Sequence, residues 1–219
     1  MPQPHDQGVI AVGSPDVIAD VSDILLQVLT AAVHESDPTA QVRLVELVGQ
    51  QQGGGGGTLG LELFLYEVTE DPSTRNRPPR RTVVEDPVSG AILQERRRAD
   101  MALLLRYLVI PTGKTPDAQQ RLLGSAMRAL YDHAILQAPQ LVAAAQSNSV
   151  ADAGEPLTLR LAPLSLDERA KVWWAIAQPY RLSLNYEVRV VNLASRDITT
   201  DSAVTGGAVD VGQIAGVRP

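Results

Sequence analysis

The sequence contains no cysteine, and this absence excludes several classes of protein at once. Without cysteine there is no disulfide framework, no thiolate nucleophile, and no zinc or iron–sulfur site built on cysteine ligands. The three histidines, His5, His34 and His133, do not show the HxxxH or HExxH spacing that is typical of metal sites. We therefore expect no bound metal and no cofactor.

Aromatic residues are also scarce, and they are missing where the positive charge is concentrated. The chain has one Phe, two Trp and five Tyr, and none of them lies among the seven arginines of residues 75–98. Single-stranded nucleic acid is usually bound by basic segments with interleaved aromatics, and a net charge of −6 opposes generic nucleic-acid binding. We expect no nucleic-acid partner.

Long apolar runs are missing as well. No run approaches the roughly 20 residues that a membrane span needs. The first ten residues have neither the basic region nor the apolar region of an export signal. We therefore expect no membrane partner and no export by a secretory signal.

What the sequence does contain is enough apolar material for a core, because 44% of its 219 residues are hydrophobic. Helices are predicted over residues 14–33, 115–134 and 165–178. The first two open with Ser or Thr followed by Pro, and the third opens with a capping box at Ser165 and Glu168. Strands are predicted by alternating or continuous apolar patterns over residues 42–48, 59–66, 101–110, 157–161 and 184–190.

The remaining segments complete the predicted architecture. Residues 82–85 and 91–95 predict a β-hairpin, whereas the two prolines at 78 and 79 argue against regular structure over 71–79. The Gly53–Gly57 run predicts a loop, residues 140–145 a short helix, and residues 146–155 another loop. The fold class is therefore α/β (α+β): a single domain with a mixed β-sheet, about three flanking helices, a protruding β-hairpin and a flexible C-terminal arm. We expect a flexible lead over 1–13, the domain over 14–195 and the arm over 196–219.

Charge is distributed unevenly along the chain. Residues 1–74 carry eleven acidic residues against Arg43 alone, a net charge of −10, whereas residues 75–98 have a net charge of +4. Such polarity suits a self-associating ring, and two ordinary solvated faces are the alternative. Trp173 and Trp174 cannot both point into one core, so one is expected at a rim or an interface, and packing of both beneath loops is the alternative. The predicted interface residues are Arg75, Arg77, Arg80, Arg81, Arg96, Arg97, Arg98, Trp173 and Trp174.

Motifs for catalysis are incomplete. Gly113-Lys114-Thr115 lies between a strand and a helix, but Leu108 occupies the position where a phosphate-binding loop needs its first glycine. Glu62 and Glu67 are expected on opposite faces of one strand, which would prevent them from acting as an acid/base pair. The chain has no GxSxG elbow. We therefore predict no catalytic residues and no enzymatic activity.

Several segments together resemble one protein family. They are IADVSDILLQVL, LGLELFLYEVTEDPSTRNRPP, ADMALLLRYLVIP, QRLLGSAMRALYDHAIL and LTLRLAPLSLDERAKVWWAIAQPYRLSLNYEVRVV. In this order, from Val17 to Ser195, they are similar to the tail-terminator or cap proteins of phage-tail-like contractile injection systems. The glycine run is an unusual insertion for that family, and the segment after Ser195 is shorter than in some of its members.

The resemblance implies a structural protein that caps a tube. Subunits would form a hexameric ring on the baseplate-distal end of the inner tube and hold the last sheath layer. The implied partners are further copies of the chain, the inner tube protein and the sheath protein. The implied location is the cytoplasm during assembly, then a particle that can be released from the cell.

A mechanism follows as a hypothesis. The acidic residues 1–74 and the basic residues 75–98 would lie on complementary flanks of neighbouring subunits, with the hairpin facing the tube or the next subunit. The arm 196–219 would add a strand to a sheath subunit. Two alternatives remain: a monomeric adaptor with a ligand pocket lined by Trp173, Trp174 and Tyr180, and an enzyme whose site has no recognisable motif.

Overall fold

The computed structural model describes residues 16–47, 58–86, 89–137, 156–193, 195 and 197–202. They fall into two compact units. The first unit contains the described residues up to Arg77 and those from Asp100 to 193, and the second contains residues 78–99 and those from Ser195 onward. Each unit is described by itself below.

A six-stranded mixed sheet forms the centre of the first unit, with the strand order β1-β2-β5-β8-β7-β6. Strand β1 runs parallel to β2, and all other neighbours in this sheet are antiparallel. The strands are β1 (Gln41–Leu44), β2 (Gly60–Glu70), β5 (Met101–Thr112), β6 (Ile135–Leu136), β7 (Leu157–Leu161) and β8 (Leu184–Leu193). The mixed sheet that the sequence predicts is therefore confirmed, although β1 ends at Leu44 rather than Val48, which lies outside the described residues.

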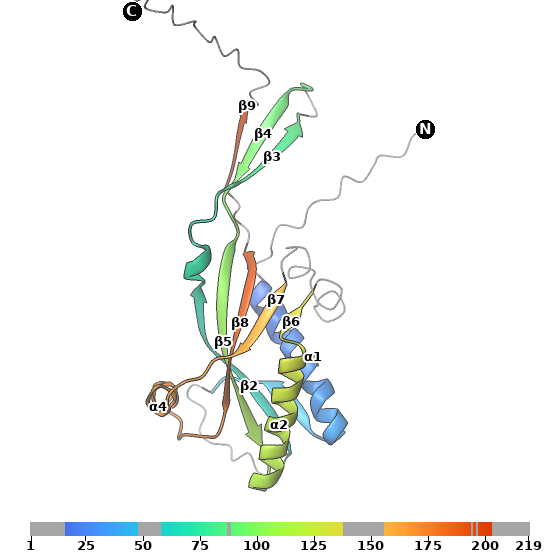
Figure 1. The fold of residues 1–219 in the computed structure, drawn as a ribbon, viewed down its shortest axis with the longest axis vertical. Coiled ribbons are helices and arrows are strands. Elements are labelled where there is room, and N and C mark those ends of the chain that lie inside the picture. Colours follow the sequence, from blue (N-terminus) through green and yellow to red (C-terminus); the bar gives the residue numbers. More distant parts are fainter. Residues whose placement is uncertain are drawn as a thin grey trace, which may run out of the picture. The chain divides into compact units, whose positions relative to one another are not determined.

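Among the described residues, three α-helices cover this sheet, as predicted: α1 (Val17–Ser36), α2 (Pro116–Asp132) and α4 (Leu166–Ala175). Helices α1 and α2 lie side by side against one face, and α4 lies at the opposite face (Figure 1). The predicted caps of the last two helices are confirmed. The Thr115 hydroxyl accepts a hydrogen bond from the amide of Ala118, and Ser165 and Glu168 form a reciprocal capping box.

The start of α1 differs from the prediction. Asp16, rather than Ser14, is its N-cap residue, and its side chain makes no capping hydrogen bond; Ser14 and Pro15 lie outside the described residues. By length and composition α1 could cross a membrane, although half of its most apolar stretch is buried within the protein. Burial of Val21, Leu25 and Leu29 shows that this apolar face belongs to the core.

Two apolar clusters lie on the two faces of the sheet. The larger one joins α1 and α2 to residues such as Leu63, Leu105 and Val188. The smaller one lies under α4 and consists of Leu47, Phe64, Leu108, Ile110, Trp173 and Ile176. Strand β5 contributes to both clusters, which confirms the prediction that it is buried on both faces over most of its length.

One polar contact lies inside the larger cluster. The Tyr107 hydroxyl lies 2.9 Å from the Ser22 hydroxyl, and Ser22 in turn donates a hydrogen bond to the carbonyl oxygen of Ile18. Either hydroxyl can be the donor in the hydrogen bond that Ser22 and Tyr107 share. Burial raises the pKa of Tyr107 to about 12, and the Ser22 contact opposes this shift only in part.

The second unit is a three-stranded antiparallel sheet with the order β3-β4-β9. Strands β3 (Arg80–Glu85) and β4 (Ile92–Arg97) form the predicted hairpin. Strand β9 (Ile198–Ser202) pairs with β4 along its whole length. The start of the predicted C-terminal arm is thus a sheet strand of its own chain, which the β-branched residues of Ile198-Thr199-Thr200 favour.

The segment that joins β2 to this hairpin also differs from the prediction. Residues Pro72–Thr74 form a 3-10 helix, because Asp71 caps it and Pro72 fits its first turn. Several other predictions fall on residues outside the described part of the chain: the lead 1–13, the Gly53–Gly57 loop, the helix 140–145, the loop 146–155 and the arm beyond Ser202.

Candidate interaction surfaces

A β-bulge in β2 determines which side chains share the face of the sheet that α4 partly covers. The pairing between β2 and β5 shifts between Leu65 and Glu67, so the alternation of the strand is reset at Tyr66. Glu62 pairs with Ile110 and Glu67 with Arg106. These two β5 residues are an even number of positions apart, so their side chains point to the same face of the sheet. Glu62 and Glu67 therefore lie on the same face, and the prediction of opposite faces is wrong because a bulge leaves no mark in a simple alternating pattern.

Four charged residues form a row across this face, which we call the charge ladder: Glu67, Arg106, Glu187 and Arg160. They are register partners on β2, β5, β8 and β7. The Nη1 of Arg106 donates to Glu67 at 2.6 Å, and its Nε donates to Glu187 at 3.1 Å. Arg160 donates to the other oxygen of Glu187 at 2.8 Å.

The charged side chains of the charge ladder are paired with one another. Glu187 is 4% exposed, and its two carboxylate oxygens are each bound by a different arginine. The hydrogen bond to Glu67 is the main reason that the pKa of Arg106 is raised. Because every charge has an opposite neighbour in the row, the ladder fixes the register of four strands rather than leaving a free charge for a ligand.

Two further charge contacts hold the same face. Glu62 is buried and accepts hydrogen bonds from Arg43 at 2.6 Å and from Arg181 at 3.1 Å. Asp71 is buried and forms an ion pair with Arg189. Burial alone would raise the pKa of Asp71, but hydrogen bonds from Ser73 and the Arg189 charge outweigh it and keep that pKa below its ordinary value.

These contacts include several of the acidic residues of the N-terminal third, residues 1–74. The sequence counts suggest a negatively charged flank, yet many of its acids face arginines of their own chain. The pairs are Glu35–Arg128, Glu62–Arg43, Glu67–Arg106, Glu70–Arg75 and Asp71–Arg189. These five carboxylates are therefore paired with arginines within the subunit.

The predicted basic interface residues lie mostly in the second unit. Arg80 is directly opposite Arg97, and Arg81 is directly opposite Arg96, so two arginine–arginine pairs lie across the β3–β4 ladder. Like charges in such positions repel each other. Within the part of the chain that the structure describes, Arg81 and Arg96 have no acidic partner. Arg98 follows β4, whereas Arg75 and Arg77 belong to the first unit.

The two tryptophans separate as predicted. Trp173 is 1% exposed and packs in the smaller apolar cluster, where its ring meets Tyr180 in an edge-on contact at 6.5 Å. Trp174 is 83% exposed. The three aromatic residues of the predicted adaptor pocket therefore do not line one cavity, because Trp174 is on the solvent side of α4.

The charge ladder and the other ion pairs on its face are not predicted by the sequence patterns. A signal was present in one case, because Arg106 interrupts the otherwise apolar stretch from Met101 to Ile110. The partners of Arg106 could not be assigned without the strand order. Among the described residues, no group of three or more His, Asp or Glu side chains is arranged to hold a metal ion.

Two solved structures resemble this fold. One is the sheath/tube terminator of PVC, an extracellular contractile injection system, in its extended state; it matches with a TM-score of 0.59 and 20% identity over 92% of this chain. The other is the tube-terminating cap of the anti-feeding prophage, with a TM-score of 0.57 and 21% identity over 88% of this chain. The chain spans 65% and 61% of the length of these two proteins. Among curated proteins, no sequence matches this chain.

The fold is thus that of terminator and cap proteins of contractile tails. The family assignment is more specific: residues 20–205 match the family model of the Pvc16 N-terminal domain, and the chain belongs to this family. The resemblance to tail terminators of contractile injection systems that the sequence motifs indicate is therefore confirmed.

Proposed function

We propose that the protein is a structural cap of a contractile injection system and has no catalytic activity. Six copies form a ring on the baseplate-distal end of the inner tube, stop its growth and anchor the last sheath layer. The observation that carries this proposal is the family match over residues 20–205, which includes both units of the structure. The shared fold with a sheath/tube terminator and a tube-terminating cap supports it.

The second unit has the properties of a surface that needs a partner. None of its described residues is buried, and Val83, Ile92 and Ile198 are all exposed. A small sheet with two open faces is only marginally stable by itself. The facing pairs Arg80–Arg97 and Arg81–Arg96 add a concentration of positive charge, so its partner carries acidic groups, on the tube or on the next subunit.

The C-terminal arm has a narrower role than its length suggests. Residues Ile198–Ser202 already pair with β4 of the same chain. Only residues beyond Ser202 are left to add a strand to a sheath subunit. Assembly takes place in the cytoplasm, and the capped particle can then be released.

The test is to add the purified protein to tube and sheath assembly reactions and to image the products by electron microscopy. We expect six-fold rings at tube ends and a restricted distribution of tube lengths. Tubes that grow without end structures, while the protein stays monomeric, would contradict the proposal.

A charge variant tests the role of the arginines in the same reaction. The double change Arg81→Glu and Arg96→Glu is expected to abolish capping while the monomer stays folded. Lys114→Glu is the matched control, because it changes an exposed positive charge in the turn before α2. Normal capping by the double variant would show that these arginines do not contact a partner.

A further inference from the structure

The outer edge of β3 has no partner strand within the part of the chain that the structure describes. The second sheet has the order β3-β4-β9, so only one side of β3 is paired. Asp86 donates its backbone N–H to the carbonyl oxygen of Ala91 at 2.9 Å, and this bond continues the register of the hairpin. Because hydrogen-bonded and non-hydrogen-bonded pairs alternate in an antiparallel ladder, Arg81, Val83 and Glu85 direct their backbone N–H and C=O groups to the outer edge. Such an edge is a template for a further strand.

The charges along this edge complement themselves. Strand β3 together with Asp86 reads RRTVVED, with two basic residues at its start and two acidic residues at its end. When β3 of a second copy is aligned antiparallel and centred on Val83, Arg81 of each copy lies opposite Glu85 of the other. The same alignment places Arg80 opposite Asp86. Opposite charges in facing positions stabilise a pair of strands, so this edge fits a second copy of itself.

The backbone groups of the edge fit the same alignment. Val83 faces Val83 of the second copy, and Arg81 faces Glu85. These are the residues whose N–H and C=O groups point outward, so each facing pair can exchange hydrogen bonds. A shift by one residue would oppose these groups to residues that are already bonded to β4, and a shift by two would separate Arg81 from Glu85. Charge and hydrogen bonding therefore select one register.

Within its own chain, β3 has no such complement. Arg81 faces Arg96 on β4, and Glu85 faces Ile92. Among the described residues, neither Arg81 nor Glu85 forms an ion pair. Alternate residues of a strand share a face, so Arg81 and Glu85 lie on the same face as Val83. In the alignment above, Glu85 of the second copy lies beside Arg81 and relieves its repulsion with Arg96.

We propose that the second units of two subunits in the capped tail pair through β3, antiparallel and centred on Val83. The two three-stranded sheets then become one continuous sheet. The contact rests on the proposed ring, in which six copies at one tube end give the second units a high effective concentration. Because a contact between identical surfaces closes with two copies, the six second units form three pairs. Val83, which is 65% exposed in the single chain, then packs against its counterpart.

Exchange of the two charges tests this pairing. Arg81→Glu alone, or Glu85→Arg alone, turns two attractive facing pairs into repulsive ones and should reduce pairing about tenfold. The double variant Arg81→Glu and Glu85→Arg has opposite charges in both facing positions again, so its pairing should recover. An equal mixture of the two single variants should also pair, because each supplies the charge that the other lacks. A partner other than a second copy would lose its match to β3 in the double variant.

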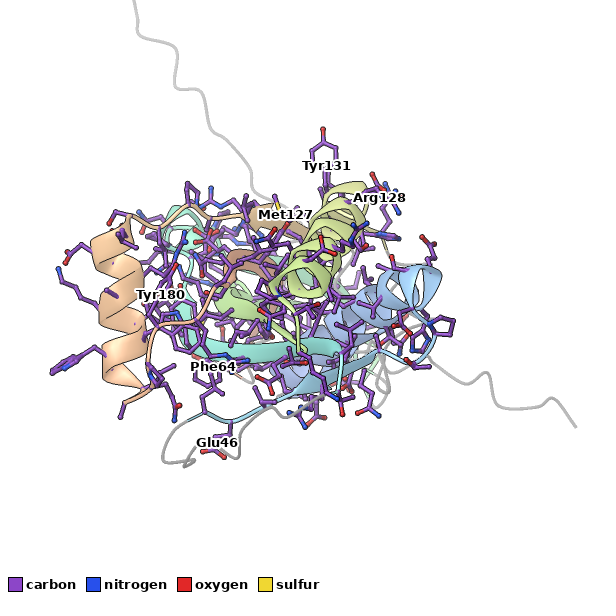
Figure 2. The ribbon with its side chains drawn as sticks, turned by 90° about the horizontal axis from the view of Figure 1, so that it is seen from below. Glu46, Phe64, Met127, Arg128, Tyr131 and Tyr180 are labelled. Atoms are coloured by element: carbon purple, nitrogen blue, oxygen red, sulfur yellow. The ribbon has the colours of Figure 1, made fainter. Side chains whose placement is uncertain are left out.

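An engineered cysteine gives the readout, because the natural chain has none. In the proposed pair the two Cα atoms of residue 83 are about 5.5 Å apart, within disulfide range, so Val83→Cys should cross-link with itself. Thr200→Cys in β9 is the matched control, an exposed strand residue at the other edge of the same sheet. Tyr131→Cys controls for random collision, because Tyr131 is 81% exposed and projects from α2 (Figure 2). Each variant is assembled on tubes and oxidised, with and without the charge changes.

We expect the Val83→Cys dimer to be about tenfold more abundant than either control dimer, to be lost with each single charge change and to return with the double change. The melting temperature of each isolated chain checks that it stays folded. Rings without the Val83→Cys dimer, or a double variant that stays unpaired, would overturn this contact and leave the proposed function standing. Failure of the natural chain to form rings on tubes would overturn the proposed function and the contact with it.

Discussion

The two units of this chain differ in how far their apolar side chains are buried and in how their charges are paired. In the first unit, apolar side chains are buried on both faces of the sheet, and buried carboxylates such as Glu62 and Glu187 are each held by two arginines. In the second, no described residue is buried, and arginines face arginines across the strands. The first unit buries its apolar side chains and pairs its buried carboxylates, whereas the second keeps apolar and positively charged side chains exposed.

The largest expected effect is the loss of stability on shortening a buried side chain of the first unit. Leu105→Ala removes a fully buried side chain and should lower the free energy of unfolding by about 3 kcal/mol. Ile92→Ala, in the exposed hairpin, should change it by less than about 1 kcal/mol. Chemical denaturation of both variants checks this; equal effects would break the contrast between the units.

The second expected effect concerns the charges of the two sheets. Glu187→Ala leaves Arg106 and Arg160 without their shared carboxylate and should cost about 2 to 3 kcal/mol. Arg96→Glu turns the facing Arg81–Arg96 pair into an opposite-charge pair and should stabilise the chain by a few tenths of a kcal/mol while impairing capping. Urea midpoints measure the first quantity and tube-length distributions the second. A destabilised Arg96→Glu monomer would mean that this arginine has a partner within its own chain.

Alkaline pH should lower the stability of the first unit through Tyr107, which is buried in its core. Because burial raises the pKa of Tyr107 to about 12, the unfolded chain loses this proton near pH 10 while the folded chain keeps it. The associated stability is complete below pH 10 and is lost as the pH rises towards 12, a loss of about 2 to 3 kcal/mol. Tyr107→Phe should reduce this alkaline loss, measured by urea denaturation at pH 8 and pH 11, whereas Tyr131→Phe on the exposed side of α2 serves as the control. An identical alkaline loss in the natural chain and in Tyr107→Phe would contradict the assignment.

The smallest expected effect is a gain at the end of α4. Ala177 has a φ of 56°, and the amides of Ala177 and Gln178 bind the carbonyls of Trp174 and Trp173 in a Schellman motif. A residue with a Cβ is strained there, so Ala177→Gly should raise stability by about 0.5 to 1 kcal/mol. A lower melting temperature for this variant would show that the left-handed conformation is not adopted in solution.

Features that depend on neighbouring residues could be predicted from the sequence. The cap at Thr115, the capping box at Ser165 and Glu168, and the burial of β5 all follow from local hydrogen bonding or from short apolar patterns. The separation of Trp173 from Trp174 follows from helix geometry, because successive positions differ by about 100°.

Features that depend on strand order could not be predicted in this way. The bulge at Tyr66 places Glu67 on the face of Glu62, and the charge ladder exists only because β2, β5, β8 and β7 are neighbours in the sheet. The same holds for the acidic N-terminal third, since Glu67, Glu35 and Asp71 are paired with Arg106, Arg128 and Arg189, which are distant in sequence. Likewise, the pairing of β9 with β4 is a non-local contact that composition does not reveal.

Hydrogen exchange of the chain alone and of the chain on tube ends tests the central claim most directly. We predict that amides of β3 exchange quickly in the isolated chain and become protected on tubes, whereas amides of β5 are protected in both states. Equal protection of β3 in the two states, under conditions where the protein is bound to tube ends, would contradict the claim that the second unit is completed by a partner in the capped tube.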